Sequence, residues 1–295
     1  MISAKIIADS INPDGVRITT FVLTYPRLIH SEFLTHRMIS RNASSSRAIP
    51  VKKQIQMVLD DPVIPLAFTK NQKGMQGGEA LDGLALEQAY NAWIDARDAA
   101  VMQAQVLVNL EVHKQYANRL LEPFSHITVV ATATDWDNFF ALRCHPMAQP
   151  EIHALADEMY AVREASKPQL LKYGRWHLPF IDESARQEIT DLFDITCLQE
   201  EAEAITIAIK CSVARCARVS YLNHDGIKTS IDDDLKLYDR LLGGIPKHSS
   251  PAEHQAQSTA ASYYTSNFKS WAQYRKMLQD ENITKFTPGM FDGPK

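Results

Sequence analysis

Two short segments of the chain have the pattern of β-strands. Residues 16–25, VRITTFVLTY, are rich in β-branched side chains and alternate roughly between apolar and polar positions. Residues 126–133, HITVVATA, have a similar composition. Pro26 directly follows the first segment and predicts its end, because proline cannot donate to a strand ladder. The sequence therefore predicts two strands that lie far apart in the chain.

Most other patterned segments have apolar residues at three- and four-residue spacing, which is typical of helices that bury one face. This spacing predicts helices over residues 28–41, 84–121, 151–172 and 198–214. Residues 69–83 are expected to form a loop, and residues 174–195 are expected to be irregular. Few strands among long helices favour an α+β fold. The chain also lacks the GxGxxG and GxxxxGK[ST] patterns of nucleotide-binding doubly wound sheets.

Three further positions have residue types that begin or end helices. Thr134 is expected to cap a helix that carries Asn138 and Arg143. These two side chains are five positions apart, about 140° around the helix axis, so they need not share one face. Ser230 begins a sequence close to a capping box, which predicts a helix that Gly243 ends.

The composition is that of an ordinary globular protein. The 295 residues are 45% hydrophobic and 22% charged, with a formal net charge of −4. Proteins that coat nucleic acids are usually strongly basic, so no nucleic-acid partner is expected. No 18-residue apolar run and no signal-like segment occurs, and the four cysteines form no CxxC pair. We therefore expect no membrane partner, reduced thiols and a cytoplasmic location.

Residues 36–47 crowd three arginines, one histidine and four serines into twelve positions. Arginine side chains offer planar pairs of donors, and serine hydroxyls and loop amides add more, which suits a phosphate group. A solvated basic loop has the same composition. A local cluster in a slightly acidic chain favours a small anionic ligand over a long nucleic acid. A non-catalytic nucleotide- or nucleic-acid-binding protein stays as an alternative of another class.

Three other segments contain conspicuous residue types. Cys144 precedes His145, but neighbouring helical residues point in different directions, so Cys144 is better interpreted as a packed thiol than as a nucleophile. Residues 248–254, HSSPAEH, contain two histidines and a glutamate without an HExxH pattern, so no metal site is expected. Residues 267–275, NFKSWAQYR, are interpreted as a plain amphipathic helix.

The basic stretch resembles the signature of the flavin-dependent thymidylate synthase family. That signature is Arg-His-Arg, seven residues, Ser, and a further Arg two positions on. Thr35-His36-Arg37, seven residues, Ser45 and Arg47 match it except at the first position.

Two more motifs follow the signature in the family's order. The pattern of Asn, four residues and Arg, followed by Ala-Gln-x-Glu-Ile, is similar to Asn138, Arg143 and residues 148–152. The element Ala-Arg-hydrophobic-Leu-Pro resembles residues 118–123, which contain Arg119.

Two family motifs that normally precede the signature come after it in this chain. Residues 218–221, RVSY, and residues 248–254 resemble the family's Arg-Val-Ser-Tyr and His-Glu-Thr-Pro-Phe-Glu-His. The order of motifs is that of a circular permutation, which a fold tolerates when its termini lie close together at the surface. We therefore expect residues 1–295 to form one α+β domain from the interleaved segments 1–175 and 210–276.

The resemblance implies an antiparallel sheet with long helices and a homotetramer whose subunits share active sites. It also implies that FAD is the cofactor, that methylenetetrahydrofolate and NADPH are co-substrates, and that dUMP is methylated at C5 to dTMP. The residues implied to bind the nucleotide are Ser45, Arg47, Arg119, Arg143 and Glu32, with Ser45 and Arg143 as the catalytic pair. The residues implied to contact FAD are His36, Arg37, Asn138, Ser220 and His254.

Several positions depart from the family pattern around the expected pyrimidine and flavin. Thr35 replaces an arginine, Glu32 stands where glutamine is common, Ala43 and Ser44 replace a Glu-Gln pair, and Met147 replaces a histidine. An ionised carboxylate only accepts hydrogen bonds, and cytosine presents an amino donor where uracil presents a carbonyl. The alternatives on the same scaffold are methylation or hydroxymethylation of dCMP, hydroxymethylation of dUMP, and a regulator without catalysis.

Overall fold

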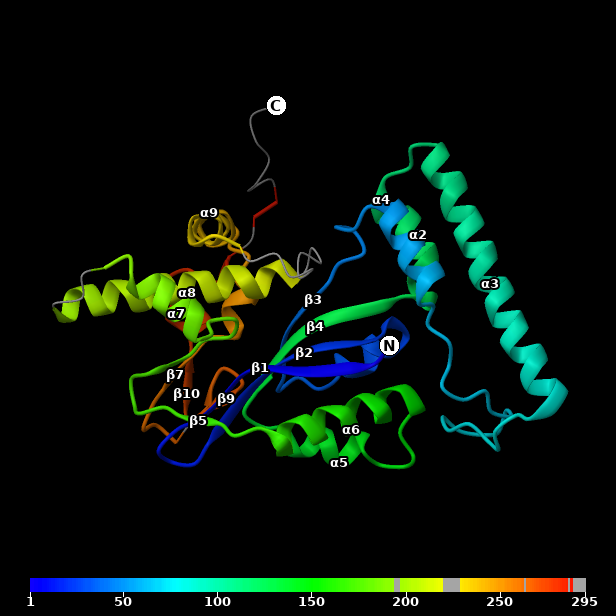
Figure 1. The fold of residues 1–295 in the computed structure, drawn as a ribbon, viewed down its shortest axis with the longest axis horizontal. Helices are drawn as coiled ribbons and strands as arrows, with labels where there is room; N and C mark the ends of the chain where they lie inside the picture. Colours follow the sequence, from blue (N-terminus) through cyan, green and yellow to red (C-terminus); the bar gives the residue numbers. More distant parts are fainter. Residues whose placement is uncertain (194–196, 220–228, 263, 286, 289–295) are drawn as a thin grey trace.

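The computed structural model describes residues 1–193, 197–219, 229–262, 264–285 and 287–288 (Figure 1). A five-stranded sheet has the order β3-β4-β2-β1-β5. Its strands are β1 (Ser3–Ile11), β2 (Arg17–Pro26), β3 (Ser40–Ala43), β4 (His126–Ala133) and β5 (Gln169–Leu170). Neighbouring strands are antiparallel except for β1 and β5, which are parallel. The predicted α+β class with an antiparallel-rich sheet is confirmed.

Both predicted strands form, and they pair with each other. β2 and β4 run antiparallel from Thr19 opposite Ala133 to Pro26 opposite His126. β1 was not predicted, because most of its side chains are half-buried and show no alternation. The two strands identified from sequence are therefore the centre of the sheet.

Helices α5 (Asp137–Arg143) and α6 (Pro150–Ala165) form a layer beside the sheet (Figure 1), with α6 packed on β1 and β2. The face that α6 buries consists of Ile152, Leu155, Ala156 and Met159, together with Glu151. Each fully buried aliphatic side chain of this size contributes roughly 1.5–3 kcal/mol. The predicted end of this helix at 172 is wrong, because Pro168 disfavours helical backbone in the residue before it.

The predicted helix over 28–41 is wrong. The chain forms a 3-10 turn, η1 (Arg27–Ile29), then the short α1 (His30–Phe33), and then turns into β3. The Arg41 guanidinium donates to the main-chain carbonyl of Ile39 at 2.7 Å and so supports the turn. Pairing of β3 with β4 overrides the local helical spacing, which is a tertiary effect.

The predicted helix over 84–121 is broken in the structure. α3 (Gly83–Asn109) is followed by α4 (Lys114–Ala117) and the 3-10 segment η2 (Asn118–Phe124). The break lies at Glu111, whose φ of 56° is in the left-handed region that ends helices.

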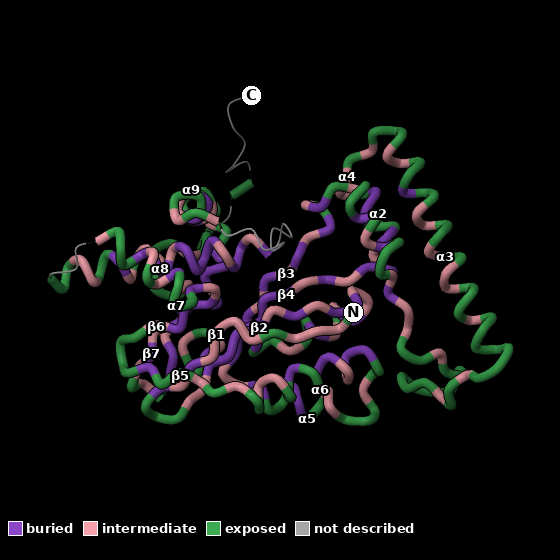
Figure 2. Tube along the Cα trace, in the orientation of Figure 1, coloured by how far each residue is buried: buried purple, intermediate pink, exposed green. Residues whose placement is uncertain are grey.

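α3 lies at the edge of the molecule and is exposed along most of its length (Figure 2). It packs against η2 and against α2 (Val51–Asp60), a helix that the sequence analysis did not predict. The indole of Trp93 on α3 donates to the carbonyl of Val63 at 2.8 Å. Of the helices in the described parts of the chain, none has the length and apolar character that crossing a membrane requires.

The helices predicted in the C-terminal half are confirmed. α8 (Leu198–Arg218) covers the predicted segment and extends beyond it. α9 (Ile231–Leu242) begins after Ser230, whose hydroxyl accepts a hydrogen bond from the amide of Asp233 at 3.1 Å. Gly243 follows its last residue, as predicted.

Two local predictions need correction. The segment 174–195, expected to be irregular, contains α7 (Glu183–Thr190). Thr134 does not cap α5, which begins at Asp137; its hydroxyl oxygen instead accepts a hydrogen bond from the amide of Lys269 at 3.1 Å. A contact with the C-terminal segment has therefore replaced the local cap.

Distant segments form a second, three-stranded sheet with the order β10-β7-β6. Its strands are β6 (Trp176–His177), β7 (Ala256–Ser258) and β10 (Trp271–Gln273), and the short hairpin beside it consists of β8 (Tyr264–Thr265) and β9 (Phe268–Lys269). The predicted helix over 267–275 is wrong, because Trp271 and Gln273 are buried with half-buried Ala272 between them, a period of two. In the chain, the 3-10 turn η4 (Ser250–Glu253) comes just before β7, and the 3-10 turn η5 (Tyr274–Met277) comes just after β10.

Candidate active site

His36 and Arg143, taken from two different sequence motifs, form a hydrogen bond. Arg143, the last residue of α5, donates from Nε to Nε2 of His36 at 2.9 Å. The His36 ring packs edge-on against Phe139, with 4.9 Å between ring centroids. Burial, together with the charges of Arg143 and Arg41, lowers the pKa of His36 to about 4. The ring is therefore neutral at pH 7, with Nε2 as acceptor and its proton on Nδ1.

A hollow of about 270 Å³ opens beside this pair. Its lining includes His36, Arg37, Asn138 and Arg143. Asn138 and Arg143 therefore reach the same hollow, although their spacing on a helix did not require it. Glu32 lies next to the group, with 3.6 Å between its Oε2 and Nη1 of Arg143. Four predicted flavin or nucleotide residues thus gather here with Glu32 beside them.

A second hollow, of about 610 Å³, shares Arg37 and Ile39 with the first. Its polar lining includes Arg41 and Glu253, so the turn after α1 faces the segment that contains η4. Within the described residues, the guanidinium of Arg37 makes no hydrogen bond or ion pair. An exposed cation without a partner beside a polar hollow is suited to bind an anion.

Ser45 and Arg47 lie in the turn after β3, whereas His36 lies before it. Four residues of extended chain span about 13 Å. Ser45 is half-buried and Arg47 is exposed. The structure therefore divides the predicted residues into two groups, one at each end of β3.

Glu122 contacts several side chains of the group that follows β3. Its carboxylate accepts hydrogen bonds from the Ser46 hydroxyl at 2.7 Å and from Nη1 of Arg119 at 2.9 and 3.1 Å. The half-buried guanidinium of Arg27 lies 3.7 Å from the same carboxylate. The amide of Asn118 donates to the carbonyl of Ser46 at 2.6 Å and fixes the loop. Arg27 and Glu122 were missed as site residues, although Glu122 stands inside the matched motif 118–123.

His254 ends a buried chain of hydrogen bonds between the two sheets. Its Nδ1 lies 2.8 Å from the Thr132 hydroxyl, which lies 2.8 Å from that of Thr20. The Thr20 hydroxyl contacts Nε2 of His177 at 2.8 Å, and Nδ1 of His177 contacts the Ser10 hydroxyl at 2.9 Å. Burial lowers the pKa of both histidines to about 3. Both rings are therefore neutral at pH 7, and a flavin contact of His254 stays a prediction.

Two other predicted positions contribute less to the site. Burial and the neighbouring Asp157 raise the pKa of the half-buried Cys144 thiol to about 11. That thiol is protonated near neutral pH, which agrees with a packed thiol rather than a nucleophile. Ser220 lies outside the described residues, and its flavin contact stays a prediction.

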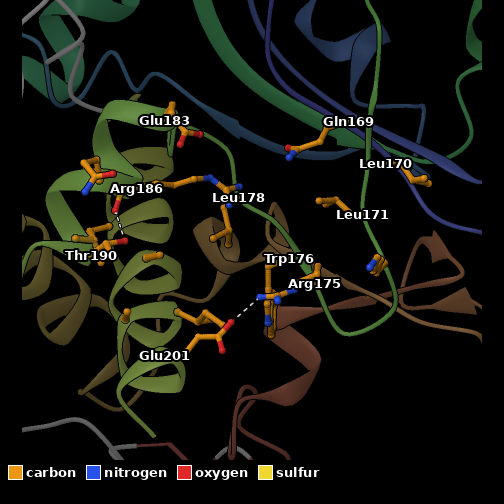
Figure 3. Close-up of a pocket in the computed structure, with 16 residues that line it drawn as sticks. Gln169, Leu170, Leu171, Arg175, Trp176, Leu178, Glu183, Arg186, Thr190 and Glu201 are labelled. Atoms are coloured by element: carbon orange, nitrogen blue, oxygen red, sulfur yellow. Dashed lines mark hydrogen bonds and ion pairs between the residues drawn. The ribbon is translucent and has the colours of Figure 1, made fainter. Parts of the chain in front are cut away.

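A larger hollow, of about 720 Å³, lies between α7, α8 and β6 (Figure 3). Trp176, Leu178 and Arg186 line it, and an ion pair of 2.8 Å joins Arg175 to Glu201 at its wall. None of the predicted site residues within the described ranges lines this hollow. The candidate active site is therefore the smaller, arginine-lined region around His36.

The fold and this region define an α+β protein with arginine, histidine and carboxylate side chains gathered beside one edge of its sheet. The family model described as thymidylate synthase complementing protein, Thy1, matches residues 16–169, just over half of the chain. The chain therefore belongs to the thymidylate synthase complementing protein family, and the resemblance identified in the sequence is confirmed. The match spans Glu32 to Arg143, whereas Ser220 and His254 lie outside it.

The solved structures that resemble this fold include two of the UMP/dUMP methylase PolB from Streptomyces cacaoi, one bound with 5-Br dUMP and one with 5-Br UMP. Each has 16% sequence identity and a TM-score of 0.46, and each match covers 56% of this chain and 90% or 89% of the other. A search of curated proteins found no significant match.

Proposed function

We propose that the protein methylates C5 of a pyrimidine deoxynucleotide monophosphate, converting dUMP to dTMP. FAD is the proposed cofactor, and methylenetetrahydrofolate and NADPH are the proposed carbon donor and reductant. The observation that carries the proposal is the 2.9 Å hydrogen bond between His36 and Arg143. It joins two separate motifs of the family at one hollow, which a chance match in sequence would not require.

The residues present suit a flavin with a diphosphate tail. The neutral His36 ring and Asn138 line the 270 Å³ hollow, which suits the polar edge of a flavin ring. Arg37 lines both this hollow and the 610 Å³ hollow. The guanidinium of Arg37, which has no partner within the described residues, supplies a donor for phosphate. A bound flavin would supply the hydride, and the protein would orient and polarise the nucleotide.

The roles proposed for this chain's own residues follow from their charge and position. Arg143 would donate to the pyrimidine edge and stabilise negative charge on the ring, which raises electron density at C5. Ser45 and Arg47 would hold the nucleotide phosphate, with Arg119 positioned by its two hydrogen bonds to Glu122. Arg143 and Ser45 are the proposed catalytic residues.

Glu32 supports a second candidate, methylation or hydroxymethylation of dCMP. Its carboxylate lies 3.6 Å from Arg143 and only accepts hydrogen bonds when ionised. Cytosine offers an amino group to such an acceptor, whereas uracil offers a carbonyl. Glu32 would then contact the base directly.

A homotetramer with shared active sites is also proposed, and the surface of α3 supports self-association. Met102, Val106 and Leu110 follow one another at four-residue spacing and are all exposed. Such a stripe on a helix normally packs against another surface. Light scattering should therefore give four times the monomer mass, and charged substitutions at Met102 and Val106 should lower it.

We further propose that segments 1–175 and 210–276 form one domain. Contacts between them include the Thr132–His254 hydrogen bond and the hydrogen bond that the Trp271 indole donates to the Val16 carbonyl at 3.1 Å. If they fold together, denaturant unfolding should show a single transition by circular dichroism and by tryptophan fluorescence.

The decisive experiment for the reaction offers dUMP and dCMP in parallel. Purified protein is incubated with FAD, methylenetetrahydrofolate and NADPH, and the nucleotide products are analysed by mass spectrometry. A mass gain of one methylene unit on dUMP supports the first candidate, and a gain on dCMP supports the second. No modified nucleotide from either, with flavin bound, would support a regulator without catalysis.

A further inference from the structure

The C-terminal segment 264–282 lies outside the family match. It forms hydrogen bonds with residues 38–40, in the turn that follows His36 and Arg37 of the signature. The side-chain amide of Asn267 donates to the carbonyl of Met38 at 3.0 Å and to the Ser40 hydroxyl at 3.0 Å. The amide of Gln273 donates to the Ser40 hydroxyl at 3.2 Å and to Oδ1 of Asn267 at 2.9 Å. Ser40 is buried, so this network holds the segment in a fixed position.

The same segment forms one wall of the 610 Å³ hollow. Arg37 and Arg41 come from the signature turn, whereas Ser266, Asn267 and Lys276 come from the C-terminal segment. With Ser250 and Glu253 of η4, the hollow is therefore built from three parts of the chain that are separate in sequence. The matched family motifs alone would not supply Ser266, Asn267 and Lys276 to its lining.

The charged groups in and behind the hollow are not balanced. The four cations are Arg37, Arg41, Arg275 and Lys276, and the two carboxylates are Glu253 and Glu281. Arg275 forms ion pairs with both carboxylates, and Lys276 forms an ion pair with Glu281. The cluster thus has an excess of two positive charges, and Arg37 has no partner within the described residues.

We propose that this hollow binds the diphosphate group of FAD, with Lys276 as a binding residue that the family motifs do not supply. The inference rests on the proposed function, since it names how the flavin cofactor is held. A diphosphate diester has two negative charges, which match the excess of two positive charges. The Lys276 ammonium has three donors, so it can bind a phosphate oxygen while it keeps its contact with Glu281. Ser266 adds a neutral hydrogen-bonding group at the same wall.

The test compares flavins with and without the diphosphate. FAD and riboflavin are titrated, by flavin fluorescence, into the wild-type protein and into Lys276→Gln and Arg37→Gln variants. Each variant is expected to bind FAD about tenfold more weakly and riboflavin unchanged, because only a charge-assisted contact to phosphate is lost. Lys269→Gln is the matched control, since Lys269 is an exposed lysine of the same segment that does not line the hollow. Thermal unfolding checks that all variants are folded.

The outcomes separate this inference from the proposed function. If Lys276→Gln binds FAD as tightly as the wild type, or loses riboflavin equally, the assignment of Lys276 is overturned, and flavin binding by the wild type still stands. If the wild type binds no flavin, the proposed function fails, and calorimetry with inorganic diphosphate decides the inference. Binding of diphosphate that Lys276→Gln weakens would then support the anion site, and no binding or unchanged binding would overturn it.

Discussion

The carboxylate of Glu32 lies 3.6 Å from the guanidinium of Arg143, and the same guanidinium donates to the neutral ring of His36. Arg143 therefore links His36 of the family signature with Glu32, a position where the family commonly has glutamine. Because Arg143 can share its donors between Glu32 and a bound base, the charge of Glu32 is expected to influence which base is bound.

Glu32→Gln should shift base preference toward uracil. The substitution removes the negative charge and adds an amide donor, which can reach a uracil carbonyl. A hydrogen bond to a charged group contributes about 1.5–3 kcal/mol, so the ratio of kcat/KM for dUMP over dCMP should rise by about tenfold or more. Competition between the two nucleotides, followed by mass spectrometry, measures this ratio. Glu158→Gln, an exposed change on α6, should leave it unaltered, and an unaltered ratio in Glu32→Gln would remove Glu32 from the base site.

Arg143→Lys should lower kcat by about a hundredfold, which is typical for loss of a donor that stabilises developing charge. Lysine keeps the charge but lacks the planar fork of donors, so it does not reproduce the fixed geometry in which Arg143 would contact both His36 and the base. Arg240→Lys on α9 is the control of the same chemistry away from the site. Equal activity of the two variants would contradict the role proposed for Arg143.

Arg143→Leu should raise the pKa of His36 above its value of about 4. Burial is the main cause of the low pKa and the charge of Arg143 is the next, so the rise should be partial. NMR titration of the His36 ring protons measures the change. A pKa that stays at about 4 would mean that burial and the charge of Arg41 lower it without Arg143.

Acid should destabilise the fold through His177. Its pKa is lowered from 6.5 to about 3 by burial, so the unfolded chain binds a proton that the native state does not bind. The stabilisation from the neutral ring is complete above pH 6.5 and is lost as pH falls toward 3, at up to about 1.4 kcal/mol per pH unit.

Urea unfolding at several pH values between 7 and 4 measures this dependence. His177→Asn should lower stability at pH 7, because the hydroxyls of Ser10 and Thr20 lose their partner, but it should also flatten the slope below pH 6.5. A variant slope as steep as that of the wild type would assign the acid sensitivity to other groups, such as His254.

Leu155→Ala should destabilise the protein by about 2–5 kcal/mol, since Leu155 is fully buried between α6 and the sheet and its removal leaves a cavity. Leu170→Ala changes the same side chain at an exposed position of β5 and should have little effect. Urea unfolding of both variants makes the comparison. A similar loss of unfolding free energy in the two variants would contradict the packing of α6 on the sheet.

The sequence by itself determined the features that depend on local chemistry. The β-branched composition of residues 16–25 and 126–133 was enough to identify β2 and β4, and Ser230 and Gly243 correctly marked the ends of α9. The order and spacing of residues around His36, Ser45 and Arg143 were enough to identify the family, because these motifs are read along the chain.

Only the tertiary structure decided which of these residues meet. Residues 28–41 and 267–275 have helical spacing but form turns and strands, because pairing with β4 and β7 stabilises extended chain more than local hydrogen bonds do. The contact of Glu32 with Arg143, the role of Glu122 and the wall formed by Lys276 depend on groups far apart in sequence. Local spacing contains no information about such distances, since they are fixed by the packing of the whole fold.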